Sequence, residues 1–133
     1  MEHVRYLVIL GLLGGDTAIR STELVSEAPV LDISELERRA IRSLKAEDGE
    51  ESSFEEARII GAWEFEKDGD SGGIYWVFTS AWDTHGAESS APFEVISNEP
   101  ITSYDQLMQW VQEAADKSLM HVHQILGITK LKR

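Results

Sequence analysis

Two segments of this sequence alternate polar and apolar residues with a period of two, which an extended strand turns into one apolar and one polar face. Residues 57–66 read ARIIGAWEFE and residues 74–82 read IYWVFTSAW. The stretch KDGDSGG between them contains Asp-Gly and Gly-Gly, which form tight turns at low steric cost. The pattern predicts a β-hairpin over 57–82.

The predicted hairpin is rich in aromatic residues, with three of the four tryptophans of the chain. Aromatic side chains on neighbouring strands form cross-strand pairs and fill a core. We therefore predict that Trp63 and Trp76 are largely buried structural residues.

Three further segments are predicted to be strands. Residues 3–13 (HVRYLVILGLL) are almost continuously apolar and rich in β-branched residues, as in a central strand. Residues 17–26 alternate weakly and suit an edge strand, and residues 92–97 (PFEVIS) form another short strand. A turn is expected at the glycine pair of residues 14–16, because the residues after it do not continue a phosphate-binding loop.

Two helices are marked by Ser-x-x-Glu/Gln capping boxes. The first box is Ser34 with Glu37, and its helix is expected to end near Gly49. The second box is Ser103 with Gln106, and an apolar stripe at helical spacing carries that helix to Leu126. A short last strand is expected only after this point, at residues 128–132 (ITKLK).

These elements predict an α+β fold, with one antiparallel sheet of about five strands and two helices packed on one face. At 133 residues the chain is expected to form a single domain over 1–133. Residues 47–56 (EDGEESSFEE) carry six acidic side chains and no basic one, so a mobile acidic loop is expected there. No internal repeat is expected.

The charge is concentrated in the middle of the chain. The net charge is −12, and residues 46–116 carry 17 acidic and two basic side chains. Such a field repels nucleic acid and membrane surfaces and attracts basic partners. Neither direct nucleic-acid binding nor membrane binding is therefore expected.

Several chemistries find little support in the composition. The chain has no cysteine, which excludes disulfides and thiolate ligands and fits a cytoplasmic protein. The apolar run 7–15 lacks the basic flank of a signal peptide and is too short to span a bilayer. Residues 68–73 (DGDSGG) start like a calcium loop but have glycine at its fifth position, so a turn is preferred. No cofactor and no metal are expected.

Three histidine and aspartate positions support an alternative, a metal-dependent or carboxylate enzyme that uses His85, His121 and Asp83. His121 and His123 could bind one metal ion only from a strand, since the predicted helix points them apart. No nucleophile motif accompanies them, so catalytic residues are not assigned.

The leading hypothesis is a small acidic, non-enzymatic binding protein that blocks a basic, nucleic-acid-binding surface of a protein partner. Nuclease immunity proteins and phage-encoded DNA mimics have the same gross charge, although no motif links this chain to them. A third hypothesis is a structural or scaffold subunit whose acidity serves solubility. The predicted partner-binding residues are the carboxylates of the middle segment: Glu50, Glu51, Glu55, Glu56, Glu64, Glu66, Asp68 and Asp70.

Overall fold

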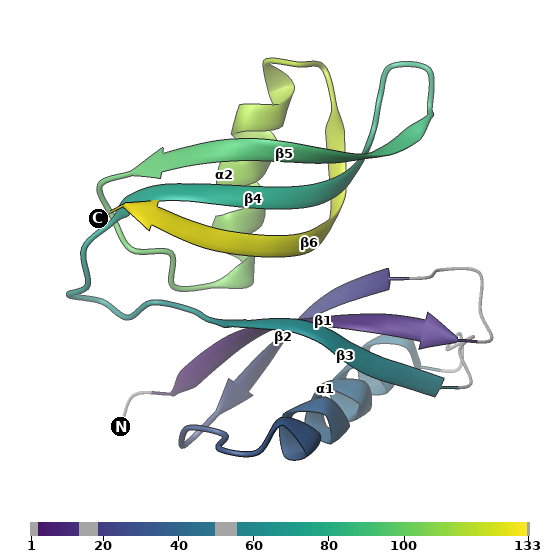
Figure 1. Ribbon diagram of the computed structural model, residues 1–133, viewed down its shortest axis with the longest axis vertical. Helices are drawn as coiled ribbons and strands as arrows, with labels where there is room; N and C mark the ends of the chain where they lie inside the picture. The colour runs from purple at the N-terminus through teal and green to yellow at the C-terminus, as the bar shows by residue number, and fades with distance from the viewer. Residues whose placement is uncertain (1–2, 14–18, 50–55, 133) are drawn as a thin grey trace. The chain divides into compact units, whose positions relative to one another are not determined.

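The computed structural model describes residues 3–13, 19–49 and 56–132. The chain divides into two compact units, residues 1–64 and residues 65–133, here called the N-terminal and the C-terminal unit. Each unit has the element order β-β-α-β (Figure 1). The α+β class is confirmed, whereas a single domain over 1–133 stays a prediction.

The sheet arrangement differs from the expected one. The described residues form two three-stranded antiparallel sheets in place of one sheet of about five strands. Each sheet carries one helix on one face (Figure 1). The two helices therefore do not share one sheet, because each is packed on the strands of its own unit.

The N-terminal unit consists of β1 (Val4–Leu13), β2 (Ile19–Ser26), α1 (Ile33–Asp48) and β3 (Glu56–Glu64). The strand order is β2-β1-β3, which confirms a central strand over 3–13 and an edge strand within 17–26. The expected turn at residues 14–16 lies outside the described residues. The central position of β1 explains its continuous apolar sequence.

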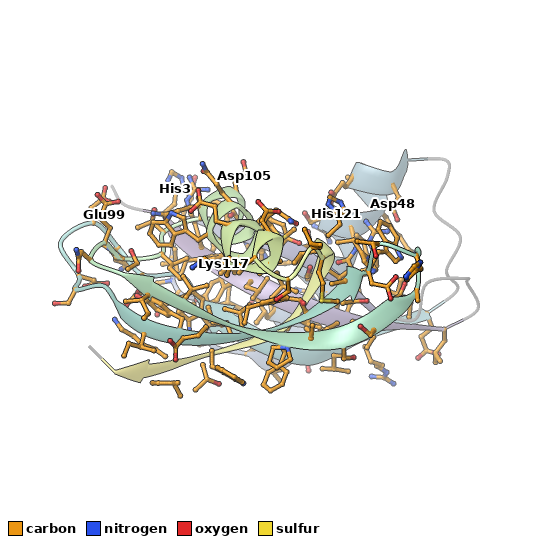
Figure 2. The ribbon with its side chains drawn as sticks, turned by 90° about the horizontal axis from the view of Figure 1, so that it is seen from above. His3, Asp48, Glu99, Asp105, Lys117 and His121 are labelled. Atoms are coloured by element: carbon orange, nitrogen blue, oxygen red, sulfur yellow. The ribbon has the colours of Figure 1, made fainter. Side chains whose placement is uncertain are left out.

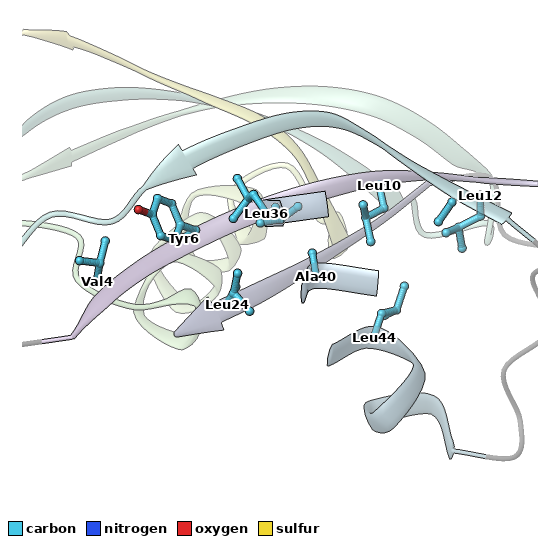
Figure 3. Packing of buried hydrophobic residues seen from close by; sticks show 10 residues of the cluster. Val4, Tyr6, Leu10, Leu12, Leu24, Leu36, Ala40 and Leu44 are labelled. Atoms are coloured by element: carbon cyan, nitrogen blue, oxygen red, sulfur yellow. The ribbon is translucent and has the colours of Figure 1, made fainter. Parts of the chain in front are cut away.

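The core of the N-terminal unit lies between α1 and its sheet (Figure 3). Leu36, Ala40 and Leu44 recur every four residues, so they share one helix face, and all three are buried. Alternate residues of β1 meet them, together with one residue each from β2 and β3: Val4, Tyr6, Val8, Leu10, Leu12, Leu24 and Ala57. Period four on the helix and period two on the strand together produce this core.

The N-cap of α1 lies two residues before the predicted one, Ser34. Asp32 is the N-cap, and its carboxylate accepts a hydrogen bond from the Ser34 backbone N–H at 2.9 Å. The Glu37 side chain does not close a capping box, because it accepts from the Ile59 backbone N–H on β3 at 2.8 Å. The predicted end is confirmed: Gly49 is the C-cap, with a φ of 61° that favours glycine.

The C-terminal unit consists of β4 (Gly73–Trp82), β5 (Glu88–Ser97), α2 (Tyr104–Asp116) and β6 (His121–Lys132), with strand order β5-β4-β6. Helix α2 buries Leu107, Val111 and Ala115, again at a spacing of four residues. They belong to a core whose other members come mainly from the strands: Tyr75, Val77, Thr79, Ala81, Ala91, Phe93, Val95, Ile101, Val122 and Ile125. The strand predicted at 92–97 is confirmed as the second half of β5.

The hairpin predicted over 57–82 is wrong. Strand β3 pairs with β1, and β4 pairs with β5 and β6. Residues 65–72 connect the two units through a turn at Gly69, which has a φ of 98°. A Cβ at Gly72 would lie 2.2 Å from the Ser97 backbone oxygen, so glycine is required there. Local alternation identified both strands, but it does not specify their partners.

The second helix is shorter than predicted. Its N-cap Ser103 is confirmed, accepting from the Gln106 N–H at 3.2 Å, but α2 ends at Asp116 and β6 begins at His121. The register of β6 against β4 shifts on both sides of Thr79, so that Val122 and Ile125 lie on the same buried face. Such bulges give a strand a three-residue spacing, which mimics a helical stripe.

The two units have the same strand register, which corrects the expectation of no internal repeat. In the N-terminal unit the pairing of the first two strands starts with Val4 and Ser26. In the C-terminal unit it starts with Gly73 and Ser97. Neither pairing has a register shift after its first pair. The two first strands and the two second strands can therefore be matched residue by residue.

The third strand repeats the same irregularity. In the N-terminal unit the register shifts just after the pair of Ile9 with Gly61. In the C-terminal unit it shifts just after the pair of Phe78 with Gly127. A β-bulge at one matched position in both units is a specific feature, so we treat the units as structural repeats.

The repeat is also visible in the sequence once the structures are matched. Residues 22–36 (TELVSEAPVLDISEL) correspond without a gap to residues 93–107 (FEVISNEPITSYDQL). This alignment superposes the two N-caps, Asp32 and Ser103, and the first buried leucine of each helix. Residues 59–61 (IIG) likewise correspond to residues 125–127 (ILG).

Candidate functional site: an aromatic sheet face

The candidate site lies on the face of the sheet β5-β4-β6 opposite α2. Strand β4 turns Tyr75, Val77, Thr79 and Ala81 towards the core, and the alternate side chains lie on the other face. Of these, Phe78 is 46% exposed and Trp82 is 41% exposed. We call this surface the aromatic face and define it by Trp76, Phe78, Trp82, His121 and His123.

Two histidines stack against Trp82 on the aromatic face. The His123 ring centroid lies 4.2 Å from that of Trp82, with 14° between the planes. The corresponding values for His121 are 5.9 Å and 10°. Because residues 121–132 form a strand, both imidazoles lie on one face, contrary to the helical prediction. The two stacked imidazoles hold the Trp82 indole in place at the end of β4.

Polar groups surround the second of these histidines. His123 Nε2 lies 2.9 Å from Ser80 Oγ and 3.3 Å from a carboxylate oxygen of Glu88. Glu88 is the first residue of β5 and pairs in register with Trp82. The aromatic face therefore has a carboxylate beside its exposed indole.

Trp76 and Phe78 form a second aromatic pair, with an edge-to-face geometry of 83° and a centroid distance of 6.1 Å. Glu94 on β5 pairs in register with Trp76 and is exposed. Trp76, and Trp63 on β3, are both half-buried and neither is exposed. Each lies on the sheet face that its helix does not cover, and their structural role stays a prediction.

The matched surface of the N-terminal unit is different. The structural repeat aligns Leu7 with Trp76 and Ile9 with Phe78. Leu7 is 0% exposed and Ile9 is 3% exposed. The matched strand positions thus carry aliphatic residues in one unit and aromatic residues in the other. Large exposed apolar residues in a cluster are typical of interaction sites.

Most of the predicted partner-binding carboxylates do not form one cluster in the described residues. Glu50, Glu51 and Glu55 lie outside those residues. Glu56, at the start of β3, is exposed and forms an ion pair with Arg58 at 3.4 Å. Glu64 ends the same strand and is exposed. The expected acidic loop is helical at its start, where Asp48 receives two hydrogen bonds of 3.1 Å from Arg20.

Glu66 belongs to a hydrogen-bond network inside the C-terminal unit. One carboxylate oxygen accepts from the Tyr75 hydroxyl and from the Ile101 backbone N–H, and the other accepts from Lys130. Burial raises the pKa of Glu66, but the hydrogen bonds from Lys130, Tyr75 and Ile101 outweigh it and hold the pKa below its ordinary value. Glu66 therefore stays ionised at neutral pH.

Tyr75 is the neutral donor of this network. Burial, followed by the hydrogen bond to Glu66, raises the pKa of Tyr75 above its ordinary value. The hydroxyl therefore remains protonated and donates to the carboxylate. The Lys130 ammonium also lies 5.3 Å from the Tyr75 ring centroid, within the range of a cation–π contact.

Asp68 and Asp70 lie in the turn that connects the units. Both are exposed, and the Asp70 carboxylate accepts from the Lys67 backbone N–H at 2.8 Å. The Asp70 N–H in turn donates to the Lys67 carbonyl at 3.0 Å. The turn prediction for 68–73 is confirmed, with Asp70 closing the turn.

The residues of the enzyme alternative are divided between a turn and a strand. Asp83 closes the β4–β5 turn by accepting from the backbone N–H groups of His85 and Ala87, at 2.8 and 3.0 Å. His121 stacks on Trp82 instead. Within residues 3–13, 19–49 and 56–132, no three His, Asp or Glu side chains come together as metal ligands.

Sequence reasoning did not identify Phe78, Trp82, Glu88 and Glu94 as site residues. The signal was present in β4, where both alternating sets of residues 74–82 are largely apolar. A strand with one helix-covered face needs only one apolar set. The second set therefore indicates a further contact surface.

Comparison with protein-family models, with curated proteins and with solved structures finds no match to this chain. None of the helices in the described ranges is long and apolar enough to cross a membrane.

Proposed function

We propose that this protein is a non-enzymatic binding protein that covers a basic surface of a protein partner with its aromatic face. The carrying observation is the exposure of Phe78 and Trp82 beside two carboxylates, Glu88 and Glu94. Aromatic residues are enriched among the residues that dominate binding energy, and rigid strands lose little entropy when they bind.

The overall charge supports the basic character of the partner. A net charge of −12 speeds the approach of a basic protein, and carboxylates beside the aromatic anchors favour lysine and arginine on the facing surface. The carboxylates of residues 47–70 contribute to the long-range electrostatic attraction of this partner. When this protein occupies the basic surface of the partner, that surface can no longer bind a polyanion.

The test is affinity capture from a lysate of the source cells at low and high salt, with Trp82→Ala and Phe78→Ser beside the wild-type protein. Leu31→Ser, at a residue that is 94% exposed in the N-terminal unit, is the matched control. We expect one basic protein to be retained by wild type and control, released at high salt, and lost by both aromatic-face variants. Urea unfolding checks that each variant is folded.

The proposal fails if the aromatic-face variants retain the same proteins as the wild type. It also fails if no captured protein is sensitive to salt, which would favour the scaffold hypothesis. Quadruple substitution of Glu50, Glu51, Glu55 and Glu56 by glutamine tests the field separately. Because exposed charges act mainly through steering, it should slow association and leave dissociation unchanged.

A further inference from the structure

A groove of about 630 Å³ runs between the edge strand β5 and helix α2, within the C-terminal unit. Its floor and walls come from residues 94–99 on the β5 side and from Trp110, Glu113, Ala114 and Lys117 on the α2 side. Glu99, which precedes α2, and Lys117, its C-cap, can be located in Figure 2. The groove is distinct from the aromatic face.

The groove is acidic. Two carboxylates line it, from Glu99 and Glu113, against the single ammonium of Lys117. Glu94 borders the groove through strand β5, but its side chain alternates with buried residues of that strand and lies on the aromatic face. In the described part of the chain none of the three side chains of Glu99, Glu113 and Lys117 takes part in an ion pair. Trp110 adds a half-buried indole to the wall. An occupant would thus meet unpaired negative charge around an aromatic surface.

One side of the groove is a sheet edge. Strand β5 pairs with β4 alone in the described sheet, so its other side carries backbone groups without a strand partner. Pro92 lacks an N–H, which restricts pairing at the start of the strand, whereas residues 93–97 beside the groove keep theirs. A segment in the groove can therefore also pair with this edge.

The repeat provides an internal comparison. The position of Trp110 corresponds to Arg39 in the N-terminal unit, and that guanidinium donates to Ser26 Oγ at 3.2 Å. The position of Glu113 corresponds to Arg42. The N-terminal unit thus places two arginines where the C-terminal unit has an indole and a carboxylate. The matched positions are therefore basic in the N-terminal unit, where those of the C-terminal unit are aromatic and acidic.

We infer that the groove binds an extended basic segment of the protein partner, which adds to β5 as a further strand. Backbone hydrogen bonds to the edge would give affinity, and lysine or arginine side chains directed at Glu99 and Glu113 would give specificity. The inference rests on the proposed function for the basic partner, but it uses other residues and a different mode of contact.

The probe is a short labelled peptide of alternating lysine and valine, titrated into the full chain and followed by fluorescence anisotropy. We expect saturable binding that weakens with salt. We also expect new protection from hydrogen exchange at the alternate amides of residues 93–97 that face the free edge, since the other amides face β4. Methylating the backbone nitrogens along one edge of the peptide removes its donors without changing its charge. That peptide should bind at least about tenfold more weakly.

Two variants test the groove. Trp110→Arg gives it the side chain of the N-terminal unit and should reduce affinity about tenfold, whereas Glu113→Gln should reduce it several-fold. Glu27→Gln is the matched control, because it removes one exposed carboxylate at the position that corresponds to Asn98. Its affinity should equal that of the wild type.

The inference is wrong if the methylated peptide binds as well as the unmethylated one, or if Glu27→Gln and Glu113→Gln weaken binding equally. Either result would mean attraction by net charge alone. Whole-partner capture with Trp82→Ala addresses the aromatic face instead. Failure of the peptide experiment and failure of the proposed function are therefore separate outcomes.

Discussion

The two units repeat one backbone but secure the segment before the helix differently. In the N-terminal unit the Tyr6 hydroxyl accepts directly from the Val30 N–H at 2.9 Å. In the C-terminal unit the matched tyrosine, Tyr75, donates to Glu66, and Glu66 accepts from Ile101, the residue that corresponds to Val30. A carboxylate has been inserted between the same two partners.

This difference shows how one scaffold accommodates a charge. The inserted carboxylate needs a cation, and Lys130 supplies it from β6. Lys130 corresponds to Glu64 in the N-terminal unit, and Glu64 is exposed. A half-buried carboxylate is stable only when a cation or hydrogen-bond donors offset its lost hydration, so Glu66 and Lys130 act as one structural ion pair. This ion pair also anchors the connecting segment to the C-terminal unit.

The helix-covered cores should be equivalent, and large truncations test this most strongly. Leu36→Ala and Leu107→Ala each remove a buried leucine from the first turn of a helix. Each should lower the free energy of unfolding by about 2–5 kcal/mol, measured by urea denaturation followed by circular dichroism. A loss below about 1 kcal/mol at one site alone would contradict equivalent cores.

The inserted carboxylate should matter only to the C-terminal unit. Glu66→Gln keeps an acceptor for Ile101 but leaves Lys130 without its charge partner, so we expect a loss of about 1–3 kcal/mol in the free energy of unfolding. Glu64→Gln, two residues earlier and exposed, should change it by less than about 0.5 kcal/mol. Equal effects of the two substitutions would remove the structural role assigned to Glu66.

The pH dependence sharpens the same comparison. The pKa of Glu66 is lowered in the folded protein relative to its ordinary value of 4.5, so its stabilisation is complete above that value. It is lost as the pH falls through the lowered pKa. The difference in unfolding free energy between wild type and Glu66→Gln should be constant near neutral pH and shrink in acid. If this difference in unfolding free energy grew in acid, the pKa of Glu66 would be raised by folding and not lowered.

The smallest effect concerns the ends of the helices. Gly49 follows α1 with a φ of 61°, whereas Leu119 follows α2 with a φ of 56° and is 72% exposed. Leucine is unfavourable in this left-handed region, and asparagine is tolerated. Leu119→Asn should therefore raise the free energy of unfolding by about 0.5–1 kcal/mol, which is measured as a slightly higher melting temperature. Gly49→Leu should have the opposite effect, and no change in either variant would argue against strain.

The local features of the fold could be predicted from the sequence. Alternation identified strands over 57–66 and 74–82, while Ser103 and Gly49 marked helix ends correctly. Each of these signals depends on a few neighbouring residues, because strand alternation and helix capping are satisfied within one element. Composition likewise determined the absence of cysteine chemistry and the net charge.

The tertiary structure decided which strands pair and therefore which side chains share a surface. Strand β3 joins β1 instead of β4, since sheet partners are selected by contacts distant in sequence. The bulges of β6 made Val122 and Ile125 look helical, and only the pairing with β4 shows that they belong to a strand.

Accessibility was decided at the same level. Trp82 and Tyr75 lie on one strand and look alike in the sequence, yet α2 covers only the face of the sheet that carries Tyr75. An apolar residue is exposed or buried according to what packs over its face, and that is a property of the assembled unit. The sequence by itself determined which elements form and their charge, and the packing of each helix on its own sheet decided which side chains remain free to bind.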